Sequence, residues 1–454
     1  MTADWFSPIS KHIFHPLYAI KDRSTQFKWL KGFEESQYFP TDKLKDLQWK
    51  RLKKLLDHAY NTCPFYRRRM DDYGVTPRDI KDESDFCKLP VLTKEDIQTN
   101  LRELIARNYS SNSLVANRTG GSTGKPIQFF HDKDRVFSMA ATAIRHNRWA
   151  GWDIGDKFAA LWGARYEFRP IESIKHRIRD ILIDRMIALD TSSLSEEKLF
   201  RFAEDLRKFR PKGILAYSNS MYLFSKFVKD NRISDLNIES IITSAEVLHD
   251  HERNLIEDVF NTRVFNRYGC REVSLIASEC EEHKGLHIAA DSLFVEIVKD
   301  GKPVEVGQEG AIIITDLLNY GMPFIRYKIE DVGVFSGEKC PCGRSLPLMK
   351  NVLGRTTDFL VTPENVMVSG ASLTIYLISN TPGVRQAQLI QNIKGQLLIK
   401  IVPSPEFNED SMKFLKNKLP EFFGPSMTYE FSFVKDIPKT SSGKYRFSIC
   451  NIQD

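Results

Sequence analysis

The sequence predicts an α/β protein with a large multi-sheet N-terminal domain and a small, mobile α+β C-terminal domain. Between residues 130 and 360, helical stretches alternate with short apolar runs, which is typical of sheets covered by helices. After about residue 359 the pattern changes to alternating strands and one helix, which indicates a separate unit of roughly 95 residues. The length of 454 residues is sufficient for two or three domains of ~150 residues each.

The N-terminal part, residues 1–105, is expected to be helical. Apolar residues recur at helical spacing among Lys, Arg and Asp over residues 43–73, and Pro64 should end or restart that helix. Thr93 followed by Lys, Glu and Asp has the form of an N-cap that opens a second helix. We place this part within a large domain of residues 1–357, followed by a small domain of residues 358–454.

The elements of the two domains follow from the same periodicities. In the large domain we expect helices at 134–148, 195–209, 220–230 and 251–260, and strands at 158–161, 213–216, 240–243, 293–298 and 311–315. In the small domain we expect strands at 386–390, 396–402 and 428–434, and a helix at 411–423.

Composition excludes several classes of protein. Lys and Arg number 65 against 59 Asp and Glu, and the net charge of +6 is spread along the chain, which does not favour nucleic-acid binding. The 42% hydrophobic content excludes wholesale disorder. No apolar run is long enough for an integral membrane segment, and the first residues lack the apolar core of a secretory signal. An odd number of cysteines, seven, favours a reducing compartment, so we expect a cytoplasmic protein.

A glycine-rich loop at residues 118–126 (RTGGSTGKP) is the first candidate site. Glycines let backbone N–H groups approach a polyanion, and Ser, Thr and Lys add donors and charge, so the loop predicts phosphate binding. A P-loop would need glycine at Thr119 and a hydroxyl at Pro126, which disfavours that motif. A flexible glycine turn without a ligand is the alternative for the loop taken alone.

A second candidate lies near the end of the chain, where residues 437–446 (IPKTSSGKYR) form a turn of small residues around Lys444. A lysine on a mobile tip can reach a developing negative charge and then withdraw. Taken alone, this stretch also fits a solvated basic turn.

Together these two motifs resemble the adenylate-forming superfamily, which comprises acyl-CoA synthetases, adenylation domains and luciferase. The similarity is strongest to the phenylacetate–CoA ligase family and its capsular-polysaccharide-associated branch. Three further motifs support it, in order along the chain: 267–272 (RYGCRE), 324–331 (FIRYKIED) and 354–358 (GRTTD). Five ordered motifs between about residues 44 and 446 are far more specific than any one of them.

The resemblance implies roles for the matching positions. The phosphates of ATP would be held by Ser122, Thr123, Gly124 and Lys125; the adenine by Ser244, Ala245, Glu246 and Tyr268, beside Gly269; and the ribose by Asp331 and Arg355. Glu272 would help to place Mg²⁺ and Lys444 would serve the adenylation step, so these two are the catalytic candidates. Asp358 would be the hinge of the small domain. A carboxylate suits two hydroxyls, and Mg²⁺ prefers carboxylates together with phosphate oxygens.

Four further residues predict a structural zinc site. Cys340 and Cys342 flank a proline in a tight turn, and Cys280 with His287 supplies a third thiolate and an imidazole. Three cysteines and one histidine are the composition of a closed zinc centre. His283 is the alternative imidazole, and the resemblance favours His287. Cys270 invites a nucleophile interpretation, but a small thiol lining a pocket is the more common case.

The resemblance implies an AMP-forming acid–thiol ligase. A carboxylic acid would react with ATP to give acyl-AMP and pyrophosphate, and a thiol of CoA or of a carrier's phosphopantetheine would then take the acyl group. The alternative is adenylyl or acyl transfer to a non-CoA acceptor in capsular or surface polysaccharide biosynthesis. A degenerate nucleotide-binding protein is a third hypothesis, which the retention of Lys444, Glu272 and Asp331 disfavours.

The sequence leaves the acid substrate open. Trp162, Tyr217 and residues 218–220 are candidate lining residues of the acyl pocket, although aromatic residues at a sheet end often serve packing alone. The expected partners are therefore a small carboxylic acid and a thiol, with no nucleic acid. A homodimer is also left open.

Overall fold

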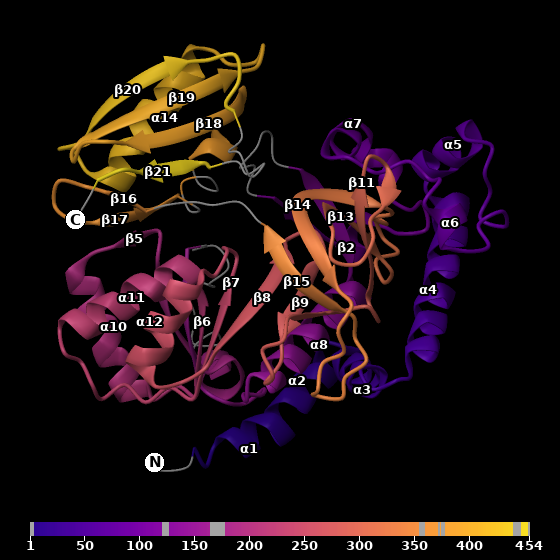
Figure 1. Ribbon diagram of the computed structural model, residues 1–454, viewed down its shortest axis with the longest axis horizontal. Helices are drawn as coiled ribbons and strands as arrows, with labels where there is room; N and C mark the ends of the chain where they lie inside the picture. The colour runs from indigo at the N-terminus through magenta and orange to yellow at the C-terminus, as the bar shows by residue number, and fades with distance from the viewer. Residues whose placement is uncertain are drawn as a thin grey trace.

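The protein is built around a 12-stranded sheet, which runs through the large domain in Figure 1. The computed structural model describes residues 4–119, 127–163, 178–353, 359–370, 373, 377–438 and 446–452. A separate four-stranded sheet forms the C-terminal domain, above the large domain in Figure 1. The predicted fold class, a large α/β domain with a small α+β domain, is confirmed.

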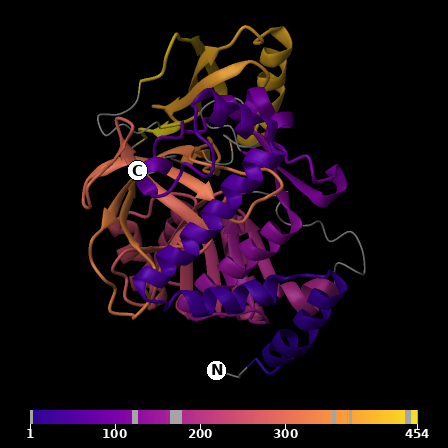
Figure 2. The same cartoon turned by 90° about the vertical axis from the view of Figure 1, so that its right-hand side faces the viewer.

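Helices form the N-terminal part of the chain as far as Leu104. Pro64 occupies the first position of a helix, where its missing N–H needs no partner. It therefore divides the helical region predicted over residues 43–73 into two helices. Thr93 and Asp96 exchange side-chain and backbone hydrogen bonds in a capping box. Figure 2 shows the long α4 crossing the near face of the molecule. The elements are α1 (Ser7–Ile9), η1 (Ser10–Phe14), α2 (His15–Lys21), α3 (Gln26–Ser36), α4 (Thr41–Thr62), α5 (Pro64–Asp72), α6 (Glu83–Phe86), α7 (Lys94–Leu104) and η2 (Ser111–Ser113).

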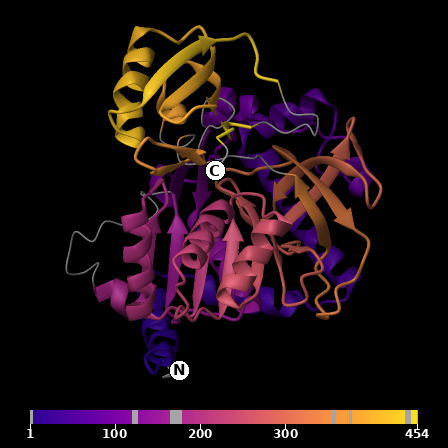
Figure 3. The same cartoon turned by 60° about the vertical axis from the view of Figure 1, so that its left-hand side comes forward.

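One part of the large sheet is parallel and is covered by helices on the face seen in Figure 3. Strands β4, β3, β6, β7 and β8 lie side by side in that order. The helices bury their apolar sides against this sheet in one shared core. The elements are β3 (Phe158–Trp162), η4 (Asp180–Asp184), β4 (Met186–Asp190), β5 (Ser193–Leu194), α10 (Glu196–Phe209), β6 (Gly213–Tyr217), α11 (Ser218–Asp230), β7 (Ser240–Ser244), α12 (Asp250–Phe260) and β8 (Val264–Cys270).

The remaining part of the sheet is antiparallel and begins where β8 turns back into β9. A two-stranded hairpin, β1–β2, packs beside it and leads into α8. The fully buried Arg135 and Arg145 of α8 pair with Asp316 and Asp291, which fixes α8 and the end of β2. The elements are β1 (Leu114–Arg118), β2 (Gln128–Asp132), α8 (Lys133–Trp149), β9 (Ser274–Glu279), β10 (Leu286–Ile288), β11 (Leu293–Lys299), β12 (Lys302–Pro303), β13 (Glu309–Asp316), β14 (Tyr327–Ser336) and β15 (Leu348–Leu353).

The C-terminal domain has its own apolar core between a mixed sheet, ordered β20-β19-β18-β21, and the helix α14. The β18–β19 hairpin turns at Gly395, whose φ of +83° favours glycine. The proposed boundary at residues 357 and 358 lies outside the described residues. The elements are β16 (Phe359–Val361), β17 (Met367–Ser369), η5 (Ile378–Asn380), β18 (Val384–Gln391), β19 (Gln396–Pro403), α14 (Glu409–Phe423), β20 (Thr428–Phe433) and β21 (Ser448–Cys450).

A small three-stranded sheet connects the two domains. Strand β17 pairs antiparallel with β16 and also with β5 of the large domain, where Met367 lies opposite Leu194. Among the described residues, no helix combines the length and apolar character needed to cross a membrane.

Candidate nucleotide site and metal centre

The turn between β8 and β9 carries the predicted adenine and magnesium residues. Gly269 lies where a Cβ atom would come within 2.5 Å of the carbonyl oxygen of Ser274, so only glycine fits this close hairpin. Tyr268 donates a hydrogen bond from its hydroxyl to Oδ2 of Asp331 at 2.9 Å. Burial, and then the charge of Asp331, raises the pKa of Tyr268, so this phenol stays protonated as a donor.

The contact between Tyr268 and Asp331 shows that the sheet is strongly curved. Three strands lie between β8 and β14 in the sheet order. In a flat sheet four strand spacings would separate them by about 19 Å. Since a phenol on β8 reaches a carboxylate on β14, the antiparallel part curls over and brings two distant motifs to one site.

Glu272 is held in the same site by a second tyrosine. The hydroxyl of Tyr327 donates to Oε1 of Glu272 at 2.8 Å. Burial, and then the charge of Glu272, raises the pKa of Tyr327 far above its usual value. The backbone carbonyl of Glu272 accepts from Nε2 of His131 on β2 at 2.7 Å. Both the side chain and the backbone of Glu272 are therefore fixed from neighbouring strands.

The glycine-rich loop joins the two strands of the β1–β2 hairpin. At its base the N–H of Thr119 donates to the carbonyl of Ile127, and the N–H of Ile127 donates to the hydroxyl of Thr119. Arg271 donates to the carbonyl oxygen of Arg118 at 3.3 Å, so the hairpin base lies beside the turn that carries Glu272. The predicted phosphate residues Ser122, Thr123, Gly124 and Lys125 lie outside the described residues, as do Arg355, Asp358 and Lys444.

The predicted adenine segment follows the end of β7. Ser244 is buried. Ala245 has a φ of +70°, a backbone conformation that residues other than glycine adopt only at an energetic cost. Glu246 accepts a hydrogen bond from the backbone N–H of Asn219 at 3.1 Å, which places its carboxylate at the start of α11. Trp162 and Tyr217 end the neighbouring strands β3 and β6, with ring centroids 4.3 Å apart.

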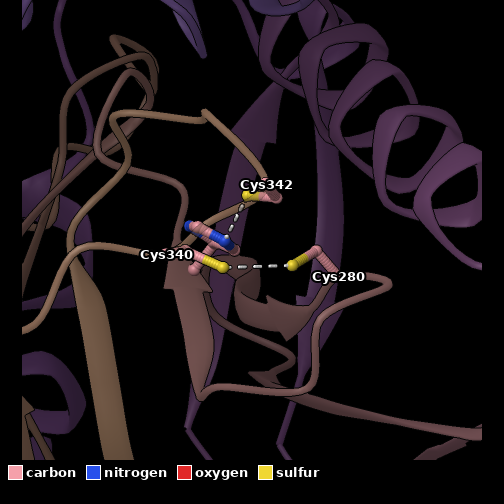
Figure 4. Close-up of side chains that lie close together, drawn as sticks. Cys280, Cys340 and Cys342 are labelled. Atoms are coloured by element: carbon pink, nitrogen blue, oxygen red, sulfur yellow. Dashed lines mark hydrogen bonds between the residues drawn. The ribbon is translucent and has the colours of Figure 1, made fainter.

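The four predicted metal ligands come together although 60 residues separate Cys280 from Cys340. The ligand atoms of Cys280, His287, Cys340 and Cys342 all lie within 4.8 Å of one another. Figure 4 shows the three cysteines directed toward one another. The sulfur atoms of Cys280 and Cys340 are 3.5 Å apart, and that of Cys342 is 3.4 Å from Nε2 of His287. The alternative imidazole, His283, is not in this group and lies 3.2 Å from Glu279.

The chain is similar to known proteins in its C-terminal domain and along most of its length. A family model described as the CapK C-terminal domain matches residues 360–451. A phenylacetate-coenzyme A ligase of Thermus thermophilus is 27% identical over 406 residues, which cover 85% of this chain and 88% of that protein. The protein CapK of Staphylococcus aureus is 26% identical over 414 residues, which cover 90% and 89%. The chain is a homologue of phenylacetate-CoA ligases and CapK.

Solved structures show the fold of this homologue. A structure of 2-hydroxyisobutyryl-CoA ligase in complex with 2-HIB-AMP and CoA, in the thioesterification state, has a TM-score of 0.65 and 16% identity and covers 92% of each chain. The same ligase in the postadenylation state has a TM-score of 0.61 at 17% identity, with 92% and 91% covered. These two structures show that the chain has the fold of this ligase.

The cysteine cluster fits a metal ion chemically. The carbonyl of Leu346 can only accept, so Nδ1 of His287 donates to it at 3.1 Å and leaves the lone pair of Nε2 facing Cys342. Burial lowers the pKa of His287 to about 4, so the imidazole is neutral. Burial opposes ionisation of Cys342, but hydrogen bonds from the backbone and side chain of Arg344 lower its pKa. Burial raises the pKa of the Cys280 and Cys340 thiols, so these two would need the charge of a bound cation to stay ionised. A neutral imidazole and one thiol of lowered pKa are a start that a metal can use.

Sequence reasoning missed two residues of the candidate nucleotide site, Tyr327 and His131. Tyr327 lies inside the motif that supplies Asp331, and a hydroxyl four residues from that carboxylate was the available signal. No signal in the sequence could have found His131, because its partner is the backbone carbonyl of Glu272. The pocket-lining interpretation of Cys270 agrees with the pKa of its thiol, which burial, followed by Glu272, raises well above the usual value.

Proposed function

We propose that this chain activates a carboxylic acid as acyl-AMP with release of pyrophosphate, and then transfers the acyl group to a thiol of CoA or a carrier. The observation that carries the proposal is the pair of carboxylates, Asp331 and Glu272, each oriented by a tyrosine beside the base of the glycine-rich hairpin. Relatives named phenylacetate-coenzyme A ligase, and a solved structure with both acyl-AMP and CoA, support this reaction class.

In the first half-reaction a carboxylate oxygen attacks the α-phosphorus of ATP, and the bond to the β-phosphate breaks as pyrophosphate leaves. Asp331 accepts from the ribose hydroxyls while Tyr268 faces the adenine. Glu272 would hold Mg²⁺, which neutralises phosphate charge when it is bound. In the second half-reaction a thiolate attacks the acyl carbonyl and AMP leaves.

We place the acceptor thiol's entry at a cavity between the two domains. It has a volume of about 730 Å³, and α11, α12 and the β16–β17 hairpin all contribute to its wall. Lys226, His249 and His251 line it together with Glu246 of the predicted adenine segment. The aromatic rings of Tyr222 and Phe227 in its wall suit the base of a nucleotide-bearing thiol such as CoA, while the charge of Lys226 is offset by the carboxylates that line the same cavity, Glu196, Asp230, Glu246 and Glu252.

The experiment that tests the proposal is a pyrophosphate-release screen over carboxylic acids, with and without CoA. We expect one class of acid to release pyrophosphate in an ATP-dependent manner, and CoA to be consumed with it. No release with any acid would contradict the proposal.

A second candidate is adenylyl or acyl transfer to a non-CoA acceptor in surface polysaccharide biosynthesis. Two observations favour it: the match of residues 360–451 to the CapK C-terminal domain, and the similarity to CapK along 90% of the chain. Pyrophosphate release without consumption of CoA, together with transfer to a sugar or amine, would select this candidate.

Nucleotide selectivity should depend on Asp331. If this carboxylate accepts from both ribose hydroxyls, each charge-assisted bond contributes about 1.5–3 kcal/mol, so dATP should be used roughly ten- to a hundredfold less well than ATP. Asp331→Ala should remove most of that discrimination and lower kcat/KM with both nucleotides.

The alternative interpretation is that Asp331 only pairs with a basic neighbour and does not contact the ribose. Of the two neighbours, Arg326 is bonded to Glu296 at 3.0 Å, which leaves Lys328. An ATP to dATP ratio that Asp331→Ala does not change would support that alternative. Tyr268→Phe should lower the preference for ATP over dATP less than Asp331→Ala does, since it removes only the hydrogen bond that orients the Asp331 carboxylate.

We further propose that Cys280, His287, Cys340 and Cys342 hold a structural zinc ion. Four protein ligands leave no open position for chemistry, so the ion would brace the β9–β10 turn against the turn before β15. Thiolate ligands and the nucleotide substrates also fit the cytoplasm, which we propose as the compartment.

The purified protein should contain about one zinc per chain, because the ligand set is complete for one ion. Cys342→Ser should lower the metal content and the melting temperature, since metal binding contributes to folding free energy. Cys450→Ser, which changes a half-buried cysteine outside the cluster, is the matched control and should alter neither. Metal analysis that finds no zinc in protein prepared without chelators would contradict this proposal.

A further inference from the structure

Exposed apolar side chains gather at the N-terminal end of the molecule. Of the thirteen large apolar side chains exposed in the described part of the chain, six come from residues 5–20 and 178–181. Trp5 is 76% exposed and Ile20 is 74% exposed. We call the six the N-terminal apolar face: Trp5, Ile13, Leu17, Ile20, Ile178 and Ile181.

The two segments that form this face are bound to each other. The hydroxyl of Ser10 donates to the carbonyl of Leu182 at 2.6 Å, and Arg179 donates to the hydroxyl of Tyr18 at 2.7 Å. On the inner side, Ser7 donates to Asp156 at 2.6 Å and the guanidinium of Arg185 lies 5.0 Å from the ring centroid of Phe6. These contacts hold the helix in place, while Ile13, Leu17 and Ile20 stay more than half exposed.

The exposed residues of this helix form one stripe. Ile13, Leu17 and Ile20 are spaced by four and three residues, so they share a helical face. Between Phe6 and Leu30 the sequence holds Lys11, Lys21, Arg23 and Lys28 but a single acidic residue, Asp22. Lys11 pairs with Asp153 at 2.7 Å, and Asp184 of the adjoining segment pairs with Arg179 at 2.9 Å, so the basic excess rests on Lys21, Arg23 and Lys28. An apolar stripe flanked by basic residues, with a tryptophan at one end, is the pattern of a helix that lies in a membrane interface.

We propose that the N-terminal apolar face binds the surface of an anionic lipid bilayer. Basic flanks complement negatively charged headgroups, whereas two copies of the same basic face would repel each other across a symmetric dimer. The figures agree that this end lies opposite the C-terminal domain, so a bound membrane would leave that domain accessible. The proposal does not depend on the proposed function.

The experiment is flotation of the full chain with vesicles of phosphatidylcholine alone or with about 30% phosphatidylglycerol, whose negative surface potential attracts basic segments. We expect binding to the anionic vesicles only, and weaker binding at high salt. Leu17→Glu with Ile20→Glu should reduce binding by about tenfold or more, because both side chains lose their place in the acyl layer.

The matched control is Val306→Glu with Ile393→Glu, which changes two side chains of similar exposure, 64% and 59%, elsewhere on the surface. This control should bind like the natural chain, and both variants should keep its melting temperature. Absence of flotation would overturn the proposal. A dimer that Leu17→Glu with Ile20→Glu dissociates, in protein that does not float, would assign the face to a second copy and would also overturn it.

Discussion

Replacement of Glu272 by glutamine should reduce acyl-adenylate formation by roughly 10²–10³-fold, the scale of one lost electrostatic group at a reacting centre. The amide can still accept from Tyr327, so the hydrogen bond seen at 2.8 Å survives while the negative charge is lost. Because a neutral amide is a weaker ligand for Mg²⁺, the variant should also need more Mg²⁺ for half-maximal rate. Pyrophosphate release measured across a magnesium titration gives both quantities.

The matched variant is Tyr327→Phe, which keeps the carboxylate but removes the donor that orients it. We expect a loss of about ten- to a hundredfold, since a hydrogen bond to a charged group contributes about 1.5–3 kcal/mol. Tyr327 is fully buried, so the melting temperature of this variant must be measured as well. If Tyr327→Phe changes stability but leaves the magnesium dependence unaltered, Tyr327 is a packing residue and not a positioning residue for Glu272.

Local signals predicted most helices and strands of this protein. The capping box at Thr93, the N-cap hydroxyl of Ser195 and the proline at residue 64 set helix ends through contacts within a few residues. The hairpin turn at Gly395 is equally local. Such elements depend on short stretches of sequence, and these are visible before the chain is folded.

The curvature of the sheet could not be predicted in this way. It depends on register between strands far apart in the chain, and it alone explains why Tyr268 of β8 meets Asp331 of β14. The pairing of β5 with β17, which joins the two domains, also has no local signal, because β5 has two residues.

The cysteine cluster could be predicted in part from local sequence and in part only from the fold. Ligand chemistry predicted the set Cys280, His287, Cys340 and Cys342 from residue type and local spacing. Only the fold brings the two halves together, since β10, which carries His287, lies between β9 and β15 in the sheet. The resemblance favoured His287 over His283, and the structure agrees, because His287 lies in the cluster and His283 lies beside Glu279.

The last prediction concerns Lys444 and rests on the motif at residues 437–446, most of which lies outside the described residues. We expect Lys444→Ala to lose acyl-adenylate formation by roughly 10²–10³-fold, because its charge would stabilise the phosphates only while ATP reacts. Thioester formation from preformed acyl-AMP should be unchanged, since no pyrophosphate leaves in that step. Each half-reaction can be followed separately once the acid substrate is identified.

Lys435→Ala is the matched control for Lys444→Ala. Lys435 is an exposed lysine of the same domain, nine residues before Lys444, so its loss changes the net charge equally. Its removal should leave both half-reactions intact. Equal losses in the two half-reactions for Lys444→Ala would contradict the proposal that the small domain presents this lysine for adenylation and withdraws it for thioester formation. A loss confined to adenylation is the result that the proposal expects.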